Sequence, residues 1–179
     1  MSVGKSGYVY DIFETDLGWV AVVAGDDGVR RMSLPERTPD IAAAAAQVID
    51  LAPRHDPEVV SGIRDAVVAF CAGQPVDLTK LPIDTEWASE FFSRAWKACR
   101  SIPAGQTRTY AWLAAEAGNA RAARGAGQAM ARNPFPLLVP CHRVVGSDGQ
   151  LHGFGGGIGL PLKARLLEME ARGAAVVAS

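Results

Sequence analysis

The stretch Thr107–Asn133, TRTYAWLAAEAGNARAARGAGQAMARN, predicts two short helices joined by a tight turn. Gly118 suits the left-handed conformation that ends a helix, and Asn119 can cap the helix that follows. The second segment is rich in alanine and glycine, which would let its backbone approach a partner surface closely. Two helices joined in this way form either a helix-turn-helix or an ordinary hairpin in which small residues serve packing. The arginines of the second segment are Arg121, Arg124 and Arg132.

The chain changes character directly after these helices. Pro134 disfavours helical conformation at Asn133, so the second helix must end there. The following sequence, NPFPLLVPCHRVVGSDGQLHGFGGG over residues 133–157, reads as irregular or extended, with three prolines before Cys141 and glycine-rich turns after it. Cys141 stands beside His142, and this neighbouring pair raises the question whether the thiol is a reagent.

A nucleophilic Cys141 would need help from its surroundings, because an unperturbed thiol with a pKa of ~8.5 is only slightly ionised at neutral pH. Adjacent side chains on an extended segment point to opposite faces, so contact with His142 requires a turn or a bridging water. A histidine base also needs an orienting carboxylate. The candidates are Asp148, Glu168 and Glu170, and the residues alone leave the choice open.

The alternative to a chemical role is a structural one, in which Cys141 is a small buried hydrophobic residue, the commonest role of cysteine. A metal site is not indicated, because the adjacent Cys141 and His142 lack the usual spacing of ligands. Cys71 and Cys99 fall on apolar helix faces and are interpreted as core. No CxxC pair occurs, so the three cysteines suggest neither a zinc ribbon nor a disulfide framework.

Two further helices flank the central region. Residues 85–105 predict an amphipathic helix capped by Thr85, with Trp87, Phe91, Ala95 and Cys99 on its buried face. Residues 160–173, LPLKARLLEMEARG, predict a shorter amphipathic helix. The half of the chain that follows residue 80 is therefore expected to be mostly helical.

The N-terminal half predicts a different architecture. Residues 8–34 read as an antiparallel β-meander broken at 16–18 and 25–28, and residues 38–52 and 57–73 read as helices, the second ending at Gly73. Residues 74–84 form a proline-containing loop. The predicted fold is therefore an α/β domain over residues 1–80 and a mostly helical domain over residues 81–179.

Charge divides the chain in the same way. Among its 179 residues, positions 1–99 carry nine basic and fifteen acidic residues, whereas positions 100–179 carry nine basic and four acidic residues. The overall charge of −1 thus conceals an acidic and a basic half, and the basic half is compatible with nucleic-acid binding. No secretory signal or membrane-spanning stretch is indicated, which favours a cytoplasmic protein.

Three blocks of the sequence, in order, resemble a known family: SIPAGQTRTYAWLAAEAG, ARAARGAGQAMARNPFPLLVPCHRVVGSDGQLHGFGGG and KARLLEMEA. Over roughly residues 85–171 the chain is similar to the O6-alkylguanine-DNA alkyltransferases, also called methylated-DNA–protein-cysteine methyltransferases. The resemblance implies an RNase-H-like N-terminal domain and a C-terminal domain with a helix-turn-helix. It implies an irreversible, single-turnover DNA repair reaction, and leaves open whether O4 of thymine is a substrate besides O6 of guanine.

The resemblance also assigns roles near the thiol. Cys141 matches the residue that accepts the alkyl group, and His142 matches a base that acts through a water. Glu170 falls at the position of the carboxylate that orients this histidine. Asn133 matches the asparagine that ties the recognition helix to the cysteine loop. No metal or other cofactor is implied.

For the partner, the resemblance implies double-stranded DNA bound through its minor groove by a protein that is a monomer, with cooperative assembly left open. Tyr110 matches the residue that rotates the damaged nucleotide out of the stack, and Arg124 matches the one that fills the gap. The implied DNA-binding set also includes Ala122, Ala123, Gly125, Gly127 and Arg132. The implied substrate pocket consists of Tyr110, Met130, Pro136, Val144, Phe154, Gly155 and Gly156.

The chain departs from the family pattern at the pocket rim. Phe154 replaces a common tyrosine, Gly155 replaces a serine found in some members, and the stretch before the last helix is about two residues longer. Two alternative functions remain at this point. One is a non-catalytic, alkyltransferase-like damage sensor, which Cys141 argues against, and the other is a thiol hydrolase, for which no oxyanion-hole motif is visible.

Overall fold

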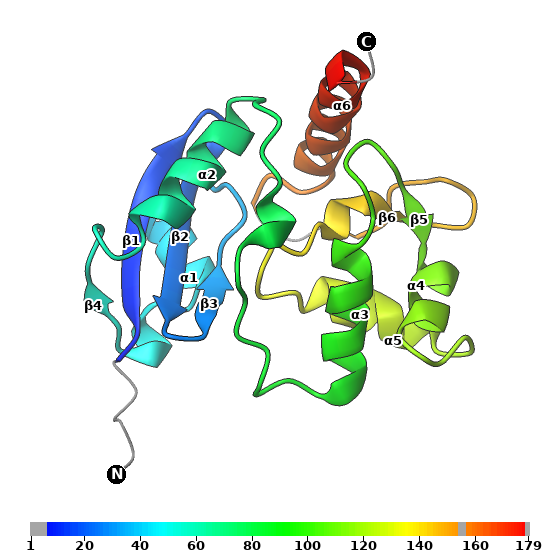
Figure 1. Cartoon of the computed structure of the whole chain (residues 1–179), viewed down its shortest axis with the longest axis horizontal. Helices are drawn as coiled ribbons and strands as arrows, with labels where there is room; N and C mark the ends of the chain where they lie inside the picture. The colour runs from blue at the N-terminus through cyan, green and yellow to red at the C-terminus, as the bar shows by residue number, and fades with distance from the viewer. Residues whose placement is uncertain (1–6, 154–156, 178–179) are drawn as a thin grey trace.

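The computed structural model describes residues 7–153 and 157–177 (Figure 1). A four-stranded sheet with helices α1 and α2 makes up one side of the molecule, and helices α3 to α6 make up the other. This mixed α/β architecture is the one predicted. Within the described ranges, no helix combines the length and apolar composition that a bilayer crossing requires.

The sheet begins with the predicted meander. Strands β1 (Val9–Thr15), β2 (Gly18–Gly25) and β3 (Gly28–Met32) pair in antiparallel fashion, and the sheet order is β3-β2-β1-β4. The short β4 (Arg54–His55), which was not predicted, pairs in parallel with β1. Consecutive residues of β2 are buried, because α1 covers one face of the sheet and α2 covers the other.

The first helix is shorter than predicted. Thr38 caps α1 (Pro39–Ala45), but the helix ends before Gln47, whose φ of 50° is left-handed. A 3₁₀ turn, Ile49–Leu51, follows in place of the continuous helix expected to residue 52. Ala46 and Val48 turn inward and pack with Ala21 and Val23 of β2, so tertiary burial overrides the helix propensity of the alanine run. The second helix, α2 (Ser61–Cys71), ends close to Gly73 as predicted.

The prediction of Thr85 as a helix cap was wrong. Helix α3 (Glu90–Arg100) is capped by Ser89, whose hydroxyl accepts from the Phe92 amide. The preceding residues are held against the sheet instead, since the Asp84 amide donates to the Val29 carbonyl of β3. Trp87 consequently lies outside the helix, 45% exposed, with its indole nitrogen bonded to the Asp84 carbonyl.

The two central helices are α4 (Tyr110–Glu116) and α5 (Ala123–Ala131). Gly118 has the predicted left-handed conformation, with φ of 92°. The capping role predicted for Asn119 was wrong, because its side chain accepts from the Arg121 amide within the turn and α5 begins only at Ala123. The remaining elements are the 3₁₀ turns η2 (Leu78–Lys80) and η3 (Cys141–Arg143), the strands β5 (Arg108–Thr109) and β6 (Val144–Val145), which pair in parallel, and α6 (Leu160–Val177).

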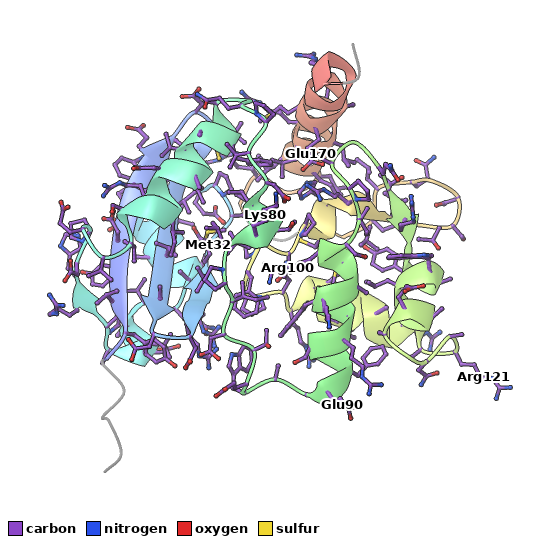
Figure 2. The ribbon with its side chains drawn as sticks, in the orientation of Figure 1. Met32, Lys80, Glu90, Arg100, Arg121 and Glu170 are labelled. Atoms are coloured by element: carbon purple, nitrogen blue, oxygen red, sulfur yellow. The ribbon has the colours of Figure 1, made fainter. Side chains whose placement is uncertain are left out.

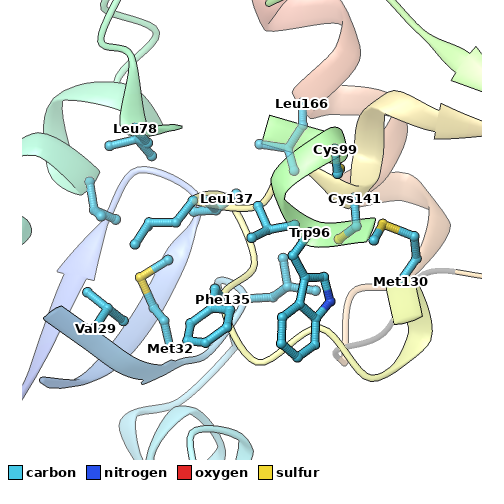
Figure 3. Packing of buried hydrophobic residues seen from close by; sticks show 14 of the residues in the cluster. Val29, Met32, Leu78, Trp96, Cys99, Met130, Phe135, Leu137, Cys141 and Leu166 are labelled. Atoms are coloured by element: carbon cyan, nitrogen blue, oxygen red, sulfur yellow. The ribbon is translucent and has the colours of Figure 1, made fainter. Parts of the chain in front are cut away.

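One hydrophobic cluster is continuous between the sheet and the helical half. Figure 3 shows Met32 of β3 close to Phe135 and Trp96. The Phe135 and Trp96 rings meet edge to face at a centroid distance of 5.4 Å, and the Trp96 indole nitrogen donates to the Ala129 carbonyl. The Met32 amide donates to the Pro134 carbonyl. This packing fixes the segment that leads to Cys141, whereas the domain division after residue 80 stays a prediction.

Replacing Phe135 by alanine should destabilise the whole protein, because the ring is fully buried between both halves. We expect the free energy of unfolding to fall by about 3–5 kcal/mol. Urea denaturation followed by tryptophan fluorescence would measure it. Val59→Ala, at a site that is 66% exposed, should change the free energy by less than about 0.5 kcal/mol. Equal losses in both variants would contradict the central role of Phe135.

Candidate active site

Asn133 controls the path of the chain into the site. Its side-chain carbonyl accepts from the Phe135 amide at 2.9 Å, and its side-chain amide donates to the Val139 carbonyl at 2.9 Å. The Cys141 amide donates to the same Val139 carbonyl at 2.7 Å. Prolines leave this segment few amides of its own to pair, so Asn133 supplies the hydrogen bonds that a regular element would otherwise provide.

Cys141 stands at the start of η3 and is only 9% exposed. It borders a cavity of about 500 Å³ to which both halves of the chain contribute residues. Burial raises the pKa of the Cys141 thiol above its ordinary value, and Asn133 together with the charge of Lys163 partly offsets this effect. The thiol is thus placed to meet a ligand but is predominantly protonated until a base assists it.

His142 is fully buried behind Cys141 and bonded to Glu170, with 3.0 Å between Nε2 and Oε1. A carboxylate can only accept, so Nε2 carries the hydrogen and Nδ1 is left with its lone pair. Nδ1 is buried and has no hydrogen-bond partner among residues 7–153 and 157–177. Burial lowers the pKa of His142, and Glu170 opposes that shift. A neutral His142 can therefore take up a proton.

Glu170 is the carboxylate that meets His142, and the other two candidates point elsewhere. The side chains of Asp148 and Glu168 are 58% and 63% exposed and pair with His152 and Arg172 respectively. Glu170 lies on the inner side of α6 (Figure 2).

The Glu170 carboxylate also accepts from Arg143, with Nη2 at 2.7 Å from Oε1 and Nε at 2.9 Å from Oε2. Burial alone would raise the pKa of Glu170, but the hydrogen bonds from His142 and Arg143 outweigh it and lower the value to about 2. The carboxylate is therefore ionised at neutral pH.

A family model and the sequences of known proteins both point to one family for this chain. The family model described as the 6-O-methylguanine DNA methyltransferase, DNA binding domain, matches residues 90–172. The methylated-DNA–protein-cysteine methyltransferase of Methanothermobacter thermautotrophicus is 39% identical over 151 residues, which cover 84% of this chain and 78% of that protein. This chain belongs to the methylated-DNA–protein-cysteine methyltransferase family.

Solved structures of the methyltransferase family share the fold. The crystal structure of the Mycobacterium tuberculosis O6-methylguanine methyltransferase matches with a TM-score of 0.76 at 30% identity, covering 92% of this chain and 93% of that one. A structure of the M. tuberculosis protein in complex with DNA matches with a TM-score of 0.75 at 31% identity. The similarity therefore extends over both halves of the chain, including the N-terminal half that the sequence motifs did not cover.

The residues predicted for the methyltransferase pocket are only partly brought together. Tyr110, Met130 and Pro136 border the cavity with Cys141. Burial is the main cause that raises the pKa of Tyr110. Val144 is fully buried in β6 and is not among the described residues that border the cavity. The remaining predicted members, Phe154, Gly155 and Gly156, lie outside the described residues.

Apart from Tyr110 at the start of α4, the predicted DNA-binding residues lie on α5 or directly beside its ends. Arg124 and Arg132 are exposed, and Arg121 extends outward from the turn (Figure 2). Gly125 faces α3, where an added Cβ would lie 3.2 Å from the Phe91 ring, so the absence of a side chain there serves helix packing. Gly127 borders the cavity instead. Ala122 and Ala123, at the start of α5, are partly buried.

Three buried charged residues near the site were not predicted. Arg143 holds Glu170 and donates to the Ile102 carbonyl at 2.5 Å. Lys163 is fully buried on α6, and its Nζ donates to the carbonyls of Val144 and His152. Lys163 lies on the inward face of α6 with Leu166 and Glu170, because the three positions are spaced as on one face of a helix. A charged residue within that otherwise apolar face could have indicated a buried charge. Glu36, from the N-terminal half, borders the cavity and carried no such signal.

Within the part of the chain that the structure describes, no group of three or more histidine, cysteine, aspartate or glutamate side chains could hold a metal ion.

Glu170→Gln should destabilise the protein by about 3 kcal/mol at pH 7, because Arg143 would lose its buried counter-charge. The folded pKa of about 2 lies below the ordinary 4.5, so the ionised carboxylate contributes stability above pH 4.5 and loses it as the pH falls towards 2. The difference between wild type and variant should shrink over that range. Urea denaturation at several pH values would measure it.

The matched control for that measurement is Glu168→Gln. Glu168 lies on the same helix but is exposed, and its pair with Arg172 is solvated. Its loss should change the free energy of unfolding by less than about 1 kcal/mol. A Glu170→Gln effect that is as small as this, or that does not change with pH, would contradict the proposed role of the buried carboxylate in stability.

Proposed function

We propose that this protein repairs DNA by direct reversal, transferring an alkyl group from O6 of guanine irreversibly to Cys141. The observation that carries this proposal is the arrangement of Cys141 and His142. The thiol borders the cavity, while the histidine behind it is bonded to Glu170 and keeps Nδ1 available. Family membership and the names of the relatives support the same reaction.

The chemistry follows from these groups. A water between Cys141 and His142 would carry the thiol proton to Nδ1, leaving a thiolate. The sulfur then forms a bond to the alkyl carbon, the bond between that carbon and O6 breaks, and its electron pair returns to the base. Protonation restores guanine. A thioether has no route back to the thiol, so each molecule acts once.

The substrate has to leave the DNA stack to react. Cys141 is nearly buried, and its cavity accommodates a single base rather than a duplex. Base flipping is the usual solution to this problem, at a cost of a few kcal/mol. We assign the rotation of the nucleotide to Tyr110, which borders the cavity, and the filling of the gap to Arg124, which is exposed on α5.

DNA would be held by α4 and α5 acting as a helix-turn-helix in the minor groove. Support comes from the left-handed turn at Gly118 and from the exposed arginines on α5 and beside it. Binding of this kind depends on phosphate contacts and weakens with salt. We propose further that the N-terminal part is RNase-H-like, which its antiparallel meander and the parallel strand β4 support. We also expect the protein to be a monomer.

Incubation with a duplex oligonucleotide that carries O6-methylguanine should add one methyl group per molecule, because the thioether is permanent. Intact mass spectrometry would measure the gain, and peptide mapping should place it on Cys141. Cys141→Ser should show no gain. Cys99→Ser keeps the acceptor and is the matched control, since Cys99 is also a buried, free cysteine.

Other outcomes of that experiment point to other functions. Binding to the damaged duplex without any mass gain would favour a damage sensor. Methyl transfer that continues beyond one group per molecule would contradict the single-turnover reaction.

Arg124→Ala should slow repair of duplex DNA by at least about tenfold, because the cost of unstacking would no longer be offset. Reaction of Cys141 with the free base O6-benzylguanine should change by less than about twofold, since no flipping is needed. Single-turnover kinetics on both substrates would measure the two rates. Arg121→Ala, three residues away, should cause a smaller, salt-dependent loss. Equal losses on duplex and free base would contradict the role of Arg124.

A further inference from the structure

The cavity that contains Cys141 has little positive charge on its border. The described residues that border it include one acidic side chain, Glu36, and neither a lysine nor an arginine. Among them, His152 is the only side chain that can become a cation, and that side chain is 57% exposed. A nucleotide that enters the cavity from DNA brings the phosphates on either side of its sugar. His152 is therefore the group on this border to which a phosphate would be attracted.

The imidazole of His152 is held by the turn that precedes it. The Gly146 amide donates to the Gln150 carbonyl at 3.0 Å and closes the turn. The ring then meets Asp148, with 3.3 Å between Nε2 and Oδ1. A Cβ added to Gly146 would lie 2.5 Å from the ring carbon Cδ2 and 2.5 Å from Oδ1, so both side chains lie directly over a glycine. The ring is thus fixed although it is exposed.

Asp148 decides which ring nitrogen carries the hydrogen. The hydrogen bond from the Gln150 amide, with a smaller part from His152, holds the pKa of Asp148 below its ordinary value. The carboxylate is therefore ionised at neutral pH and can only accept, so Nε2 of His152 carries a hydrogen. Nδ1 gains a hydrogen only when the ring is protonated. A protonated ring can donate from Nδ1 to a phosphate, whereas a neutral ring presents a lone pair that a phosphate repels.

Other charged or titratable groups face His152 from three directions. Lys163 of α6 donates to the His152 carbonyl at 3.2 Å and so fixes the backbone. Glu36, from the N-terminal half, borders the same cavity, and its carboxylate accepts from a backbone amide at 3.0 Å. Tyr110 and Cys141 also border the cavity. Burial raises the pKa of both, so that neither is charged at neutral pH.

The cavity lies beside the surface that we propose for DNA. Gly127 and Ala131 of α5 border it, and so does Tyr110 at the start of α4. A duplex bound on α4 and α5 would therefore bring the phosphates of a flipped nucleotide to this border. Arg124 does not border the cavity, so it is placed for the duplex rather than for the nucleotide that has left it.

We propose that His152, oriented by Asp148, binds a backbone phosphate next to the flipped nucleotide through its protonated imidazole. This inference rests on the proposed function and deepens it. His152 would touch the DNA backbone and not the alkyl group, so it would act on binding and not on the transfer itself. The negative charge of the phosphate would favour the protonated ring.

The first test measures affinity for a duplex with O6-methylguanine, using proteins that carry Cys141→Ser so that no transfer occurs. His152→Ala should weaken binding by at least about fivefold at pH 6 and by less than about twofold at pH 8, because histidine loses its charge over this range. His152→Lys keeps a cation at both pH values. It should bind about as tightly as the protein with His152 does at pH 6 and lose the pH dependence.

The matched control is His55→Ala. His55 is also an exposed histidine beside a carboxylate, with 3.5 Å between its Nε2 and Oδ1 of Asp11, but it does not border the cavity. Its replacement should change affinity by less than about twofold at either pH. Equal effects of His55→Ala and His152→Ala, or a His152→Ala effect that does not depend on pH, would overturn the proposal.

The second test identifies the phosphate. An uncharged methylphosphonate is placed in turn at each phosphate that flanks the lesion. At one of these positions the protein with His152 should lose at least about fivefold in affinity, whereas His152→Ala should lose less than about twofold, because the partner of that phosphate is already absent. Equal losses with and without His152 at every position would contradict the contact.

The third test separates binding from chemistry, with Cys141 intact. Reaction with the free base O6-benzylguanine should change by less than about twofold in His152→Ala, because the free base has no phosphate. A loss as large as the loss on the duplex would mean that His152 shapes the cavity instead. If the wild type binds the duplex but transfers no alkyl group, the proposed function fails, and the methylphosphonate series still decides whether His152 binds a phosphate.

Discussion

The site depends on one buried carboxylate. Glu170 accepts hydrogen bonds from His142 and Arg143, and Arg143 in turn donates to the Ile102 carbonyl just beyond the end of α3. A single ionised group thus joins α6, the 3₁₀ turn that contains Cys141 and the end of α3. Because each donor satisfies part of the carboxylate, loss of either one would leave part of the buried charge without compensation.

In the reaction that we propose, this arrangement would keep a buried thiol unreactive at rest and still allow it to react. Burial raises the pKa of Cys141 and lowers that of His142, so both groups are neutral at rest. On this proposal, proton transfer from Cys141 to His142 would become favourable only when a substrate is present to consume the thiolate. For a reagent that is used once, a low resting reactivity is an advantage, since any other electrophile would also inactivate the molecule permanently.

Features set by local chemistry could be predicted from the sequence, among them the meander, the turn at Gly118 and the end of α2 close to Gly73. The cap predicted at Asn119 failed for a local reason, since its side chain bonds within the turn, but two other predictions failed because a distant partner competes with local preference. The residues expected to begin α3 at Thr85 are held by β3 instead, and Ala46 and Val48 leave the helical path to pack on the sheet. The resemblance identified Glu170, but the partners of Lys163 and Glu36 depend on how segments far apart in the chain meet.

The N-terminal half of the chain is acidic and the C-terminal half is basic, and this difference limits which half can bind DNA. An acidic half is repelled by phosphates, so the N-terminal half is unsuited to drive DNA binding, and the basic half that carries α5 is suited to it. What the acidic half supplies is support: Met32 packs close to Phe135, and Glu36 binds the amide of Gly157. An acidic side chain suits the contact with Gly157, because the donor there is a backbone N–H, and a carboxylate accepts a hydrogen bond more strongly than a neutral oxygen does.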